Sequence, residues 1–541
     1  MLAAAPPQTP PGVHTEAVAV STEPVFTAWD YPIFALLTML NLAAVAYLFV
    51  RWFSWGDLAT HPLLFILMTF GLLLTLSMYQ LHWLSLPLMR RPQPMPPTTG
   101  WKVGVATTFV PGAESLLMLE ETLTALVAMD YPHDTWVLDE GDDEVVKRMC
   151  ERLGVHHFSR KHMSQYQTSS GTFEARTKHG NYNAWLYERG FAQYDIIAAF
   201  DPDHVPQRDF LLNVLGYFDD ARIGYVQAAQ VYYNQAASFI ARGAAEETYA
   251  YYSAIQMTSY AMGYPIVTGC HNTHRVSALK QVGGFAAHEA DDLLITVHYR
   301  RCGWKGVYVP KILAKGLTPV DWASYLGQQR RWARSVVDIK FRVYPKVATQ
   351  LPPLERVIGF VHGLCYLQSL ATALQVLLLA VMLVTGITPH VLSFATVPSV
   401  LILLAVWHLC DIYRQRFYLE PRHERGLHWR AGVLRCAKWP YLLLALYDNL
   451  RPRRRPYIIT PKVKAASKSH PLSLPHLVVV GVISMAWLAG TLLGRVTNPI
   501  VPVAGAMMVL CSLGVIATGY LRFPAPYDPS LSKAGTHKAR D

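Results

Sequence analysis

The chain has 541 residues, of which 52% are hydrophobic and 16% are charged, whereas ordinary soluble domains carry about 25% charged residues. Its net charge is +11, and the basic excess crowds a segment between apolar runs, where such residues usually face anionic lipid headgroups. The composition excludes an ordinary soluble protein. It predicts a multi-pass protein that contacts the lipid bilayer and binds no nucleic acid. The seven cysteines show no metal spacing and are predicted to be reduced.

Six apolar runs are long enough to cross a bilayer as helices, which takes about 20 residues each. They cover residues 31–50, 63–86, 371–387, 391–409, 477–493 and 500–520. The positive-inside rule places the basic segment between the fourth and fifth runs in the cytoplasm. Six spans put the large polar region between the second and third runs on the same side. We therefore predict a cell (inner) membrane protein with a cytoplasmic catalytic domain.

These runs predict the organisation of the whole chain. The first 30 residues lack the pattern of a signal peptide. In chain order we expect a flexible tail at 1–30, two transmembrane helices at 31–87, a catalytic domain at 100–345, an interface helix and two transmembrane helices at 346–410, a basic cytoplasmic segment with an interface helix and a gating-like loop at 411–475, two transmembrane helices at 476–521, and a cytoplasmic tail at 522–541.

The polar region alternates strand and helix patterns. Strands are predicted at Lys102–Val110, Thr135–Asp139 and Asp195–Phe200, and helices at Ala113–Met129 and Glu144–Leu153. This alternation is typical of an α/β domain with a mostly parallel sheet. In such sheets, ligands bind beyond the carboxyl ends of the strands.

Two acidic sites follow predicted strands. After the second strand, Asp139 and Glu140 can accept hydrogen bonds from a uracil imide or a ribose hydroxyl; the alternative is a helix N-cap region. In DPDH, Asp201 and Asp203 are separated by one residue, so extended backbone points both carboxylates the same way. Such a pair can hold Mg²⁺ together with a nucleotide diphosphate. A polar turn after the strand is the alternative.

Lys178 precedes Asn181, which is predicted to cap a helix while the lysine reaches a phosphate; an exposed surface lysine is the alternative. A third acidic site, Asp291 and Asp292, precedes a predicted helix. One carboxylate there can remove the proton of an acceptor hydroxyl as a glycosidic bond forms. The alternative is that these acids only favour the helix dipole.

The run GQQRRWARS contains Gln328, Arg331 and Trp332 on one face of a predicted amphipathic helix. The indole offers a flat face to a sugar ring, the guanidinium can offset charge on a departing diphosphate, and the amide can bind hydroxyls. A purely interfacial helix, anchored by Trp and Arg at headgroup depth, is the alternative.

The ordered motifs VLDEGDD, DPDHVPQRDF, TGCHNTHR, EADDLLITVHYRRCGWKGVYVP and QQRRWARS resemble the processive family 2 glycosyltransferases, most closely the catalytic subunits of bacterial cellulose synthase, over roughly residues 100–465. The resemblance implies a GT-A domain, a UDP-sugar donor, Mg²⁺ or Mn²⁺, inversion at the anomeric carbon, and passage of the growing polysaccharide through the transmembrane helices. Accessory export subunits are a further candidate class of partner. RPYIITPKVK is similar to the segment after the last interface helix of those enzymes. No cyclic-di-GMP-binding barrel is expected, and Arg451 and Arg455 are interpreted as lipid-facing.

The resemblance also implies residue roles. Asp292 is the general base, and Asp201 and Asp203 bind metal. The remaining substrate-binding candidates are Thr107, Asp139, Glu140, Lys178, Gly269, Cys270, Asp291, Gln328, Arg331 and Trp332. Three departures from the family's pattern concern the identity of the sugar and linkage. The usual T-E-D reads Ala290-Asp291-Asp292, the usual Asn-Glu after the first strand is replaced around Val110 to Glu114, and the usual Gly-Ser reads Gly269-Cys270.

We expect a synthase that builds a β-glucan from UDP-glucose. A 1,4-linked product is our first expectation and a 1,3-linked glucan the second, followed by polymers of other UDP-sugars or of GDP-mannose. A transporter or receptor with an inactive nucleotide-like domain would tolerate loss of the base and metal acids, which are all present. A non-processive transferase acting on lipid carriers usually lacks Q-x-x-R-W.

Overall fold

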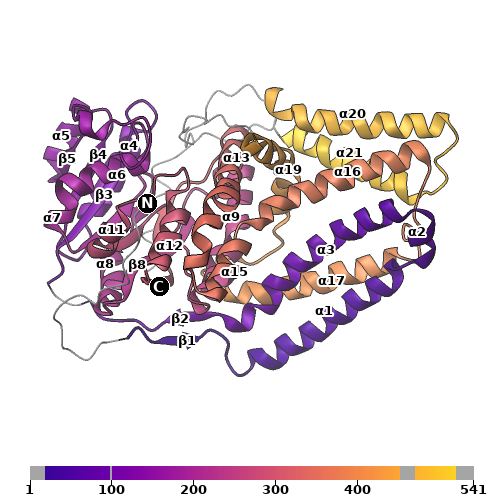
Figure 1. The fold of residues 1–541 in the computed structure, drawn as a ribbon, viewed down its shortest axis with the longest axis horizontal. Coiled ribbons are helices and arrows are strands. Elements are labelled where there is room, and N and C mark those ends of the chain that lie inside the picture. The colour runs from indigo at the N-terminus through magenta and orange to yellow at the C-terminus, as the bar shows by residue number, and fades with distance from the viewer. Residues whose placement is uncertain (1–18, 98–99, 451–469, 519–541) are drawn as a thin grey trace.

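The computed structural model describes residues 19–97, 100–450 and 470–518. An α/β domain and a bundle of long helices lie end to end along the long axis of the molecule (Figure 1). Most of the predicted flexible tail, Arg451 and Arg455, the RPYIITPKVK segment and the tail at 522–541 lie outside the described residues. All seven cysteines lie within them and form no disulfide there.

Among the described residues, six helices are long and apolar enough to cross a membrane, which confirms the predicted number of spans. They are α1 (Asp30–Trp52), α3 (Pro62–Leu84), α16 (Gln368–Thr385), α17 (Val397–Arg414), α20 (His470–Leu492) and α21 (Ile500–Thr518). Three short elements flank the first two spans along the chain: β1 (Thr22–Pro24), α2 (Trp55–Thr60) and β2 (Arg90–Pro92). β1 and β2 pair antiparallel.

The fourth span begins at Val397 and not at residue 391 as predicted. The backbone N–H groups of His390 and Val391 are held by the buried carboxylate of Asp57, at 2.7 and 3.2 Å, so this stretch forms a turn. Asp57 belongs to α2, which lies between the first two spans and is capped by the Ser54 hydroxyl. The fourth span therefore begins later than its apolar pattern predicts, because a buried carboxylate holds residues 390 and 391 in a turn.

The soluble domain is built on an eight-stranded sheet in the order β5-β4-β3-β6-β9-β8-β10-β7. Four neighbouring pairs are parallel and three are antiparallel, which confirms a mostly parallel sheet. The strands are β3 (Val103–Phe109), β4 (Asp134–Asp139), β5 (His156–Phe158), β6 (Ile196–Phe200), β7 (Val205–Pro206), β8 (Ile223–Tyr232), β9 (Asn272–Arg275) and β10 (Lys305–Gly316).

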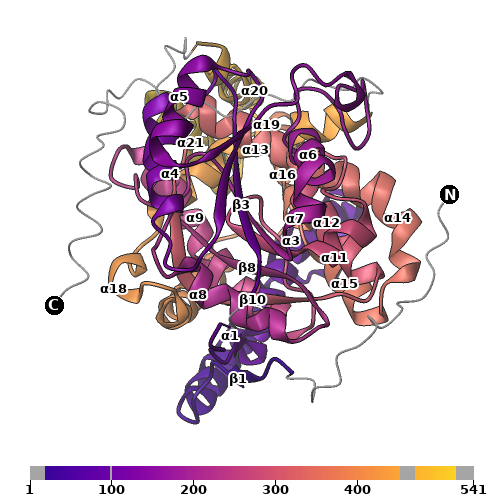
Figure 2. The same ribbon diagram turned by 90° about the vertical axis from the view of Figure 1, so that its left-hand side faces the viewer.

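Helices cover both faces of this sheet (Figure 2). Alternate side chains of a strand point to opposite faces, so Val105 joins one apolar core and Ala106 the other. The first core includes α4 (Leu116–Val127), α5 (Glu144–Leu153) and α8 (Phe210–Val214); the second includes α6 (Lys178–Trp185), α11 (Val276–Val282) and α12 (Asp291–Arg301). The predicted helix at 113–129 is shorter at both ends than expected.

Helices between the sheet and the bundle join the two parts (Figure 1). They include α9 (Phe239–Ala250), α13 (Trp322–Asp338), α15 (Pro353–Val361) and α19 (Trp429–Leu450). Further short helices of the described residues are α10 (Gln256–Ala261), α14 (Tyr344–Val347) and α18 (Pro421–Glu424). α13 packs along α19, where Ala333 meets Leu442 and Ala445 in a small apolar cluster. At its other end, Trp322 donates a 3.2 Å hydrogen bond to Thr518 of α21. The Q-x-x-R-W helix thus packs along α19 and contacts one of the six long apolar helices, α21.

Candidate active site

Side chains from three separate motifs meet beyond the end of β6. Lys178 Nζ donates to Asp201 Oδ1 at 2.5 Å and to the carbonyl oxygen of Gly269 at 2.5 Å. Gly269 in turn lies against Asp292, because a Cβ at position 269 would be 3.3 Å from Asp292 Oδ2. The sheet explains this meeting. β9 runs antiparallel to β6, so β9 begins at the edge of the sheet where β6 ends. The residues just before β9, which include Gly269, therefore lie at that edge.

The charges in this group keep Lys178 cationic and raise the pKa of Asp292. Burial lowers the pKa of Lys178, but the charges of Asp201 and Asp291 outweigh it and hold that pKa well above its ordinary value. Burial and the neighbouring Asp291 raise the pKa of Asp292 to about 7. A carboxylate with a pKa near the working pH is well suited to act as a general base.

Asp201, Asp203 and His204 form a set that fits a divalent cation. Their candidate ligand atoms all lie within 4.8 Å of one another. Asp203 is buried, with Oδ1 3.2 Å from His204 Nδ1 and Oδ2 accepting from the backbone N–H of Leu317 at 3.3 Å. Two carboxylates and one imidazole leave coordination positions for diphosphate oxygens. His204 was not predicted as a ligand, although it follows Asp203 directly in the sequence DPDH.

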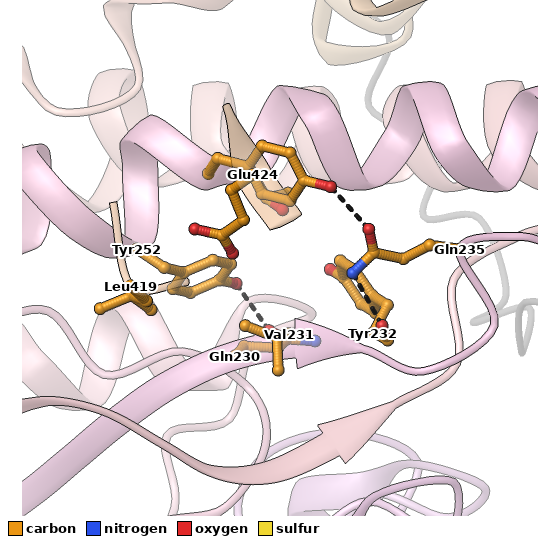
Figure 3. A pocket seen from close by; sticks show the side chains of 9 residues that line it. Gln230, Val231, Tyr232, Gln235, Tyr252, Leu419 and Glu424 are labelled. Carbon is orange, nitrogen blue, oxygen red and sulfur yellow. Dashed lines mark hydrogen bonds between the residues drawn. The ribbon is translucent and has the colours of Figure 1, made fainter. Parts of the chain in front are cut away.

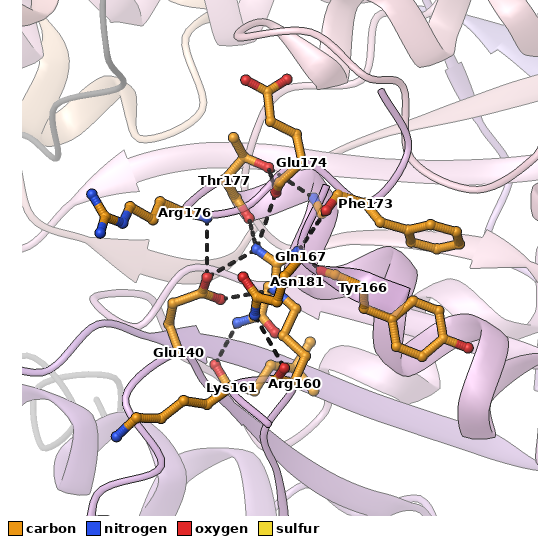
Figure 4. Close-up of polar contacts among 12 residues, drawn as sticks. Glu140, Arg160, Lys161, Tyr166, Gln167, Phe173, Glu174, Arg176, Thr177 and Asn181 are labelled. Carbon is orange, nitrogen blue, oxygen red and sulfur yellow. Dashed lines mark hydrogen bonds and ion pairs between the residues drawn. The ribbon is translucent and has the colours of Figure 1, made fainter. Parts of the chain in front are cut away.

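Asp139 and Glu140 hold a loop. Asp139 is fully buried; its Oδ1 accepts from Gly141 N–H at 2.8 Å and its Oδ2 from Asp143 N–H at 2.6 Å. Glu140 forms a two-pronged ion pair with the fully buried Arg160, at 2.9 and 3.1 Å. Arg160 also donates to carbonyl groups of residues 166–177, so it fastens the loop that leads to Lys178 (Figure 4).

Three further predicted residues lie around this loop and the sheet. Asn181 is not the helix cap, because Thr177 fills that position and accepts from Gly180 N–H at 3.1 Å. Asn181 lies inside α6, where it donates to the carbonyl of Leu138 at 2.9 Å. Thr107 is fully buried in β3, and its hydroxyl has no hydrogen-bond partner among the described residues. Cys270 is buried close to the imidazoles of His204 and His271.

Gln328, Arg331 and Trp332 are half-buried on one face of α13. The helix is capped by Asp321, which accepts from Ser324 N–H at 2.9 Å. Other side chains of α13 anchor it. Lys438 donates to Gln329 at 3.1 Å, and Arg330 pairs with Asp448 at 2.7 Å, both across to α19.

Tyr251 was not among the residues predicted from the sequence, but it lies close enough to Asp292 for that charge to act on it. Burial first, and then the charge of Asp292, raise the pKa of Tyr251. Its hydroxyl is 3.2 Å from Nε2 of His362, just before the third span. Tyr251 begins a π turn, Tyr251–Ile255. Such turns often occur at functional sites, but no local sequence pattern announces this one.

A small pocket adjoins the candidate metal ligands, because Nε2 of its lining residue Gln230 is 3.2 Å from Nε2 of His204 (Figure 3). It is lined by Gln230, Val231, Tyr232, Gln235, Thr248, Tyr249, Tyr252, Leu419 and Glu424. Tyr252 donates to Gln230 and Tyr249 donates to Gln235, each at 2.6 Å. Burial raises the pKa of Glu424 to about 7.

This chain combines acidic side chains and a lysine at the strand ends of an α/β domain with six long apolar helices. Together these features indicate a membrane-bound glycosyltransferase. The profile of glycosyl transferase family 21 matches residues 112–440, and the chain belongs to that family.

The chain is similar to cellulose synthase proteins, as its motifs predicted. It is 27% identical over 318 residues to the UDP-forming cellulose synthase 1 catalytic subunit of Komagataeibacter xylinus, an alignment covering 56% of this chain and 40% of the relative. It is 23% identical over 462 residues to putative cellulose synthase 2 of the same organism, covering 82% of this chain and 28% of the relative. The matched region is therefore less than half the length of these relatives. A solved mannosyltransferase from Pyrobaculum calidifontis is 17% identical, with a TM-score of 0.48, covering 77% of this chain and all of that one.

Proposed function

We propose that the protein is a processive inverting glycosyltransferase of the inner membrane, which polymerises a β-glucan from UDP-glucose and passes it through its own helices. The proposal rests above all on one observation: Asp292 adjoins the Lys178–Asp201 pair in a domain whose Q-x-x-R-W helix packs along α19 and contacts the apolar helix α21 through Trp322. The UDP-forming relatives support the donor, and their name supports a 1,4-linked product. A 1,3-linked glucan, or a polymer of another nucleotide sugar, is the alternative.

The reaction needs one proton removed and one leaving group stabilised. Asp292 accepts the proton of the acceptor hydroxyl while that oxygen attacks the anomeric carbon. The bond from that carbon to the diphosphate breaks, and UDP leaves with the electron pair. Attack opposite the leaving group inverts the anomeric configuration. Lys178 and Arg331 offset the negative charge on the diphosphate.

The residues near the donor have separate tasks. Asp201 and Asp203, with His204, would hold Mg²⁺ or Mn²⁺, which when bound neutralises charge on the diphosphate. Trp332 stacks on the acceptor sugar and Gln328 binds its hydroxyls. Asp139 and Glu140 act on the donor side through the loop they hold, since their carboxylates bind protein groups. Accessory export subunits would take the polymer onward.

The function is tested with purified protein in lipid, supplied with one nucleotide sugar at a time and with Mg²⁺ or Mn²⁺. We expect UDP release with UDP-glucose and a polymer that is degraded by a glucanase specific for 1,4-linkages. Digestion only by a 1,3-specific glucanase assigns the alternative linkage. A product that remains in the organic phase as a short lipid-linked sugar would contradict processive synthesis, and release of no nucleotide from any donor would contradict transferase activity.

The rate should rise with pH through a midpoint near 7, because Asp292 must be ionised to act as a base and its pKa is about 7. Lys178→Met should move the midpoint up, since the lysine charge lowers the pKa of Asp292. Asp291→Asn should move it down, since the Asp291 charge raises that pKa. The measurement is kcat against pH for the three proteins. Shifts in the same direction for both variants would contradict the assignment of Asp292.

Trp332→Ala should weaken acceptor engagement more than donor binding. Stacking of a sugar on an indole is lost, whereas the donor group at Lys178 and Asp201 is untouched. We expect shorter polymers, measured by size-exclusion chromatography, with an unchanged KM for the donor. Trp429→Ala is a matched control, because Trp429 is an exposed tryptophan of α19. Wild-type polymer length in Trp332→Ala would exclude the stacking role.

A further inference from the structure

The segment just before the acid pair is fastened to α13 by two neighbouring side chains. Glu289 forms an ion pair with Arg334, whose Nη2 is 2.6 and 2.7 Å from the two carboxylate oxygens. His288 Nε2 lies 3.1 Å from Asp338 Oδ2. Arg334 and Asp338 are four residues apart and so share one face of the helix. We call these two contacts the loop clasp.

His288 also holds the backbone at the start of α12. The N–H of Ala290 donates to His288 Nδ1 at 3.0 Å. Nδ1 therefore carries no hydrogen, so the neutral ring carries its hydrogen on Nε2 and donates it to Asp338. Ala290 is the N-cap residue of α12, directly before Asp291 and Asp292. Asp338 thus orients His288, and His288 fixes the residue from which the acid pair projects.

A clasp at this point opposes a specific force. Asp292 must be ionised to act as a base, and its charge is then repelled by Asp291 and Asp201, the two anions that act on it. The repulsion from Asp201 favours movement of Asp292 away from that carboxylate, against the attraction of Lys178. Glu289 and Arg334 are each only 19% exposed, so solvent screens their attraction less than it screens a surface pair.

We propose that Glu289 and His288 are positioning residues that couple the catalytic base to the Q-x-x-R-W helix, keeping Asp292 at a fixed place relative to Arg331 and Trp332 during transfer. The inference rests on the proposed role of Asp292. A misplacement of about 1 Å in a reacting group can cost about 10²-fold in rate. The clasp therefore acts on kcat through geometry, without touching the donor.

The test uses full-length protein in lipid and compares Arg334→Gln, His288→Gln and the charge-swapped pair E289R/R334E with the wild type. Arg342→Gln is the matched control, because this exposed arginine also pairs with Asp338, at 2.8 Å, but contacts no residue of the loop. We expect Arg334→Gln and His288→Gln to lose about 10–100-fold in kcat, with the donor KM changed less than threefold. The swapped pair should recover part of the loss.

Hydrogen exchange provides a second readout that needs no turnover. Peptides covering residues 288–297 should exchange faster in Arg334→Gln and His288→Gln, and at the wild-type rate in Arg342→Gln. Wild-type exchange in both clasp variants, or equal losses in all three single variants, would overturn the proposal. A wild-type protein that transfers no sugar would overturn the proposed function instead, and the exchange rates would still decide whether the clasp orders this loop.

Discussion

Replacing Asp292 with asparagine is expected to lower polymer synthesis by about 10²–10⁴-fold, the usual contribution of a general base, while leaving UDP binding largely intact. The amide has nearly the same shape as the carboxylate and can still accept the 2.8 Å hydrogen bond from Leu293 N–H. It cannot take a proton from the acceptor hydroxyl. The donor group at Lys178 and Asp201 keeps its own contacts.

The measurements are UDP release during turnover and UDP affinity by calorimetry, both in the same lipid preparation. Asp209→Asn is the control, because it removes an exposed carboxylate from the same domain. Retention of more than a tenth of the wild-type rate by Asp292→Asn would mean that the base has been misassigned. Loss of UDP binding together with turnover would point to a folding role for Asp292.

The spans and strands could be predicted because apolar runs and alternation are local properties of the sequence. The start of the fourth span could not be predicted, because that turn is held by Asp57 of α2, which lies 333 residues earlier in the chain than His390. The meeting of Lys178 with Gly269 joins residues 91 apart. It depends on an antiparallel β9 between β6 and β8, and no pattern within β9 itself reveals that placement.

Asp139 shows a different limit of the sequence. Its position at a strand end predicted a contact with the donor base, and the same residues also suggested a helix N-cap region. In the structure the cap is Asp143, whose side chain accepts from Val145 N–H at 2.7 Å. Asp139 binds the backbone of that cap instead. A carboxylate at a strand end can either bind a ligand or hold the backbone of the following loop, and the sequence pattern is the same for both. The burial of Asp139 and its bonds to backbone N–H groups show that it holds the loop.

Asp201→Asn should raise the Mg²⁺ or Mn²⁺ concentration needed for half-maximal rate by at least about 10–100-fold, the cost of losing even an outer partner of a metal site. Asp201 is the more exposed carboxylate of the DPDH pair and the one that also contacts Lys178. The neutral amide is a weaker ligand for a hard cation. At a fixed metal concentration, Asp201→Asn should therefore be slower than the wild type. Chelation of the metal should abolish wild-type turnover.

Two roles for Asp201 give different results in a comparison with Lys178→Met. If Asp201 only holds the lysine, both variants lose the same activity and neither changes the metal requirement. If Asp201 is a ligand, only Asp201→Asn and Asp203→Asn change that requirement, because Asp203 belongs to the ligand set and Lys178 does not. The metal requirement of all three variants is measured by titrating the rate of UDP release with Mn²⁺. We expect the second result, since a lysine already neutralising Asp201 can move to the diphosphate when the cation takes its place.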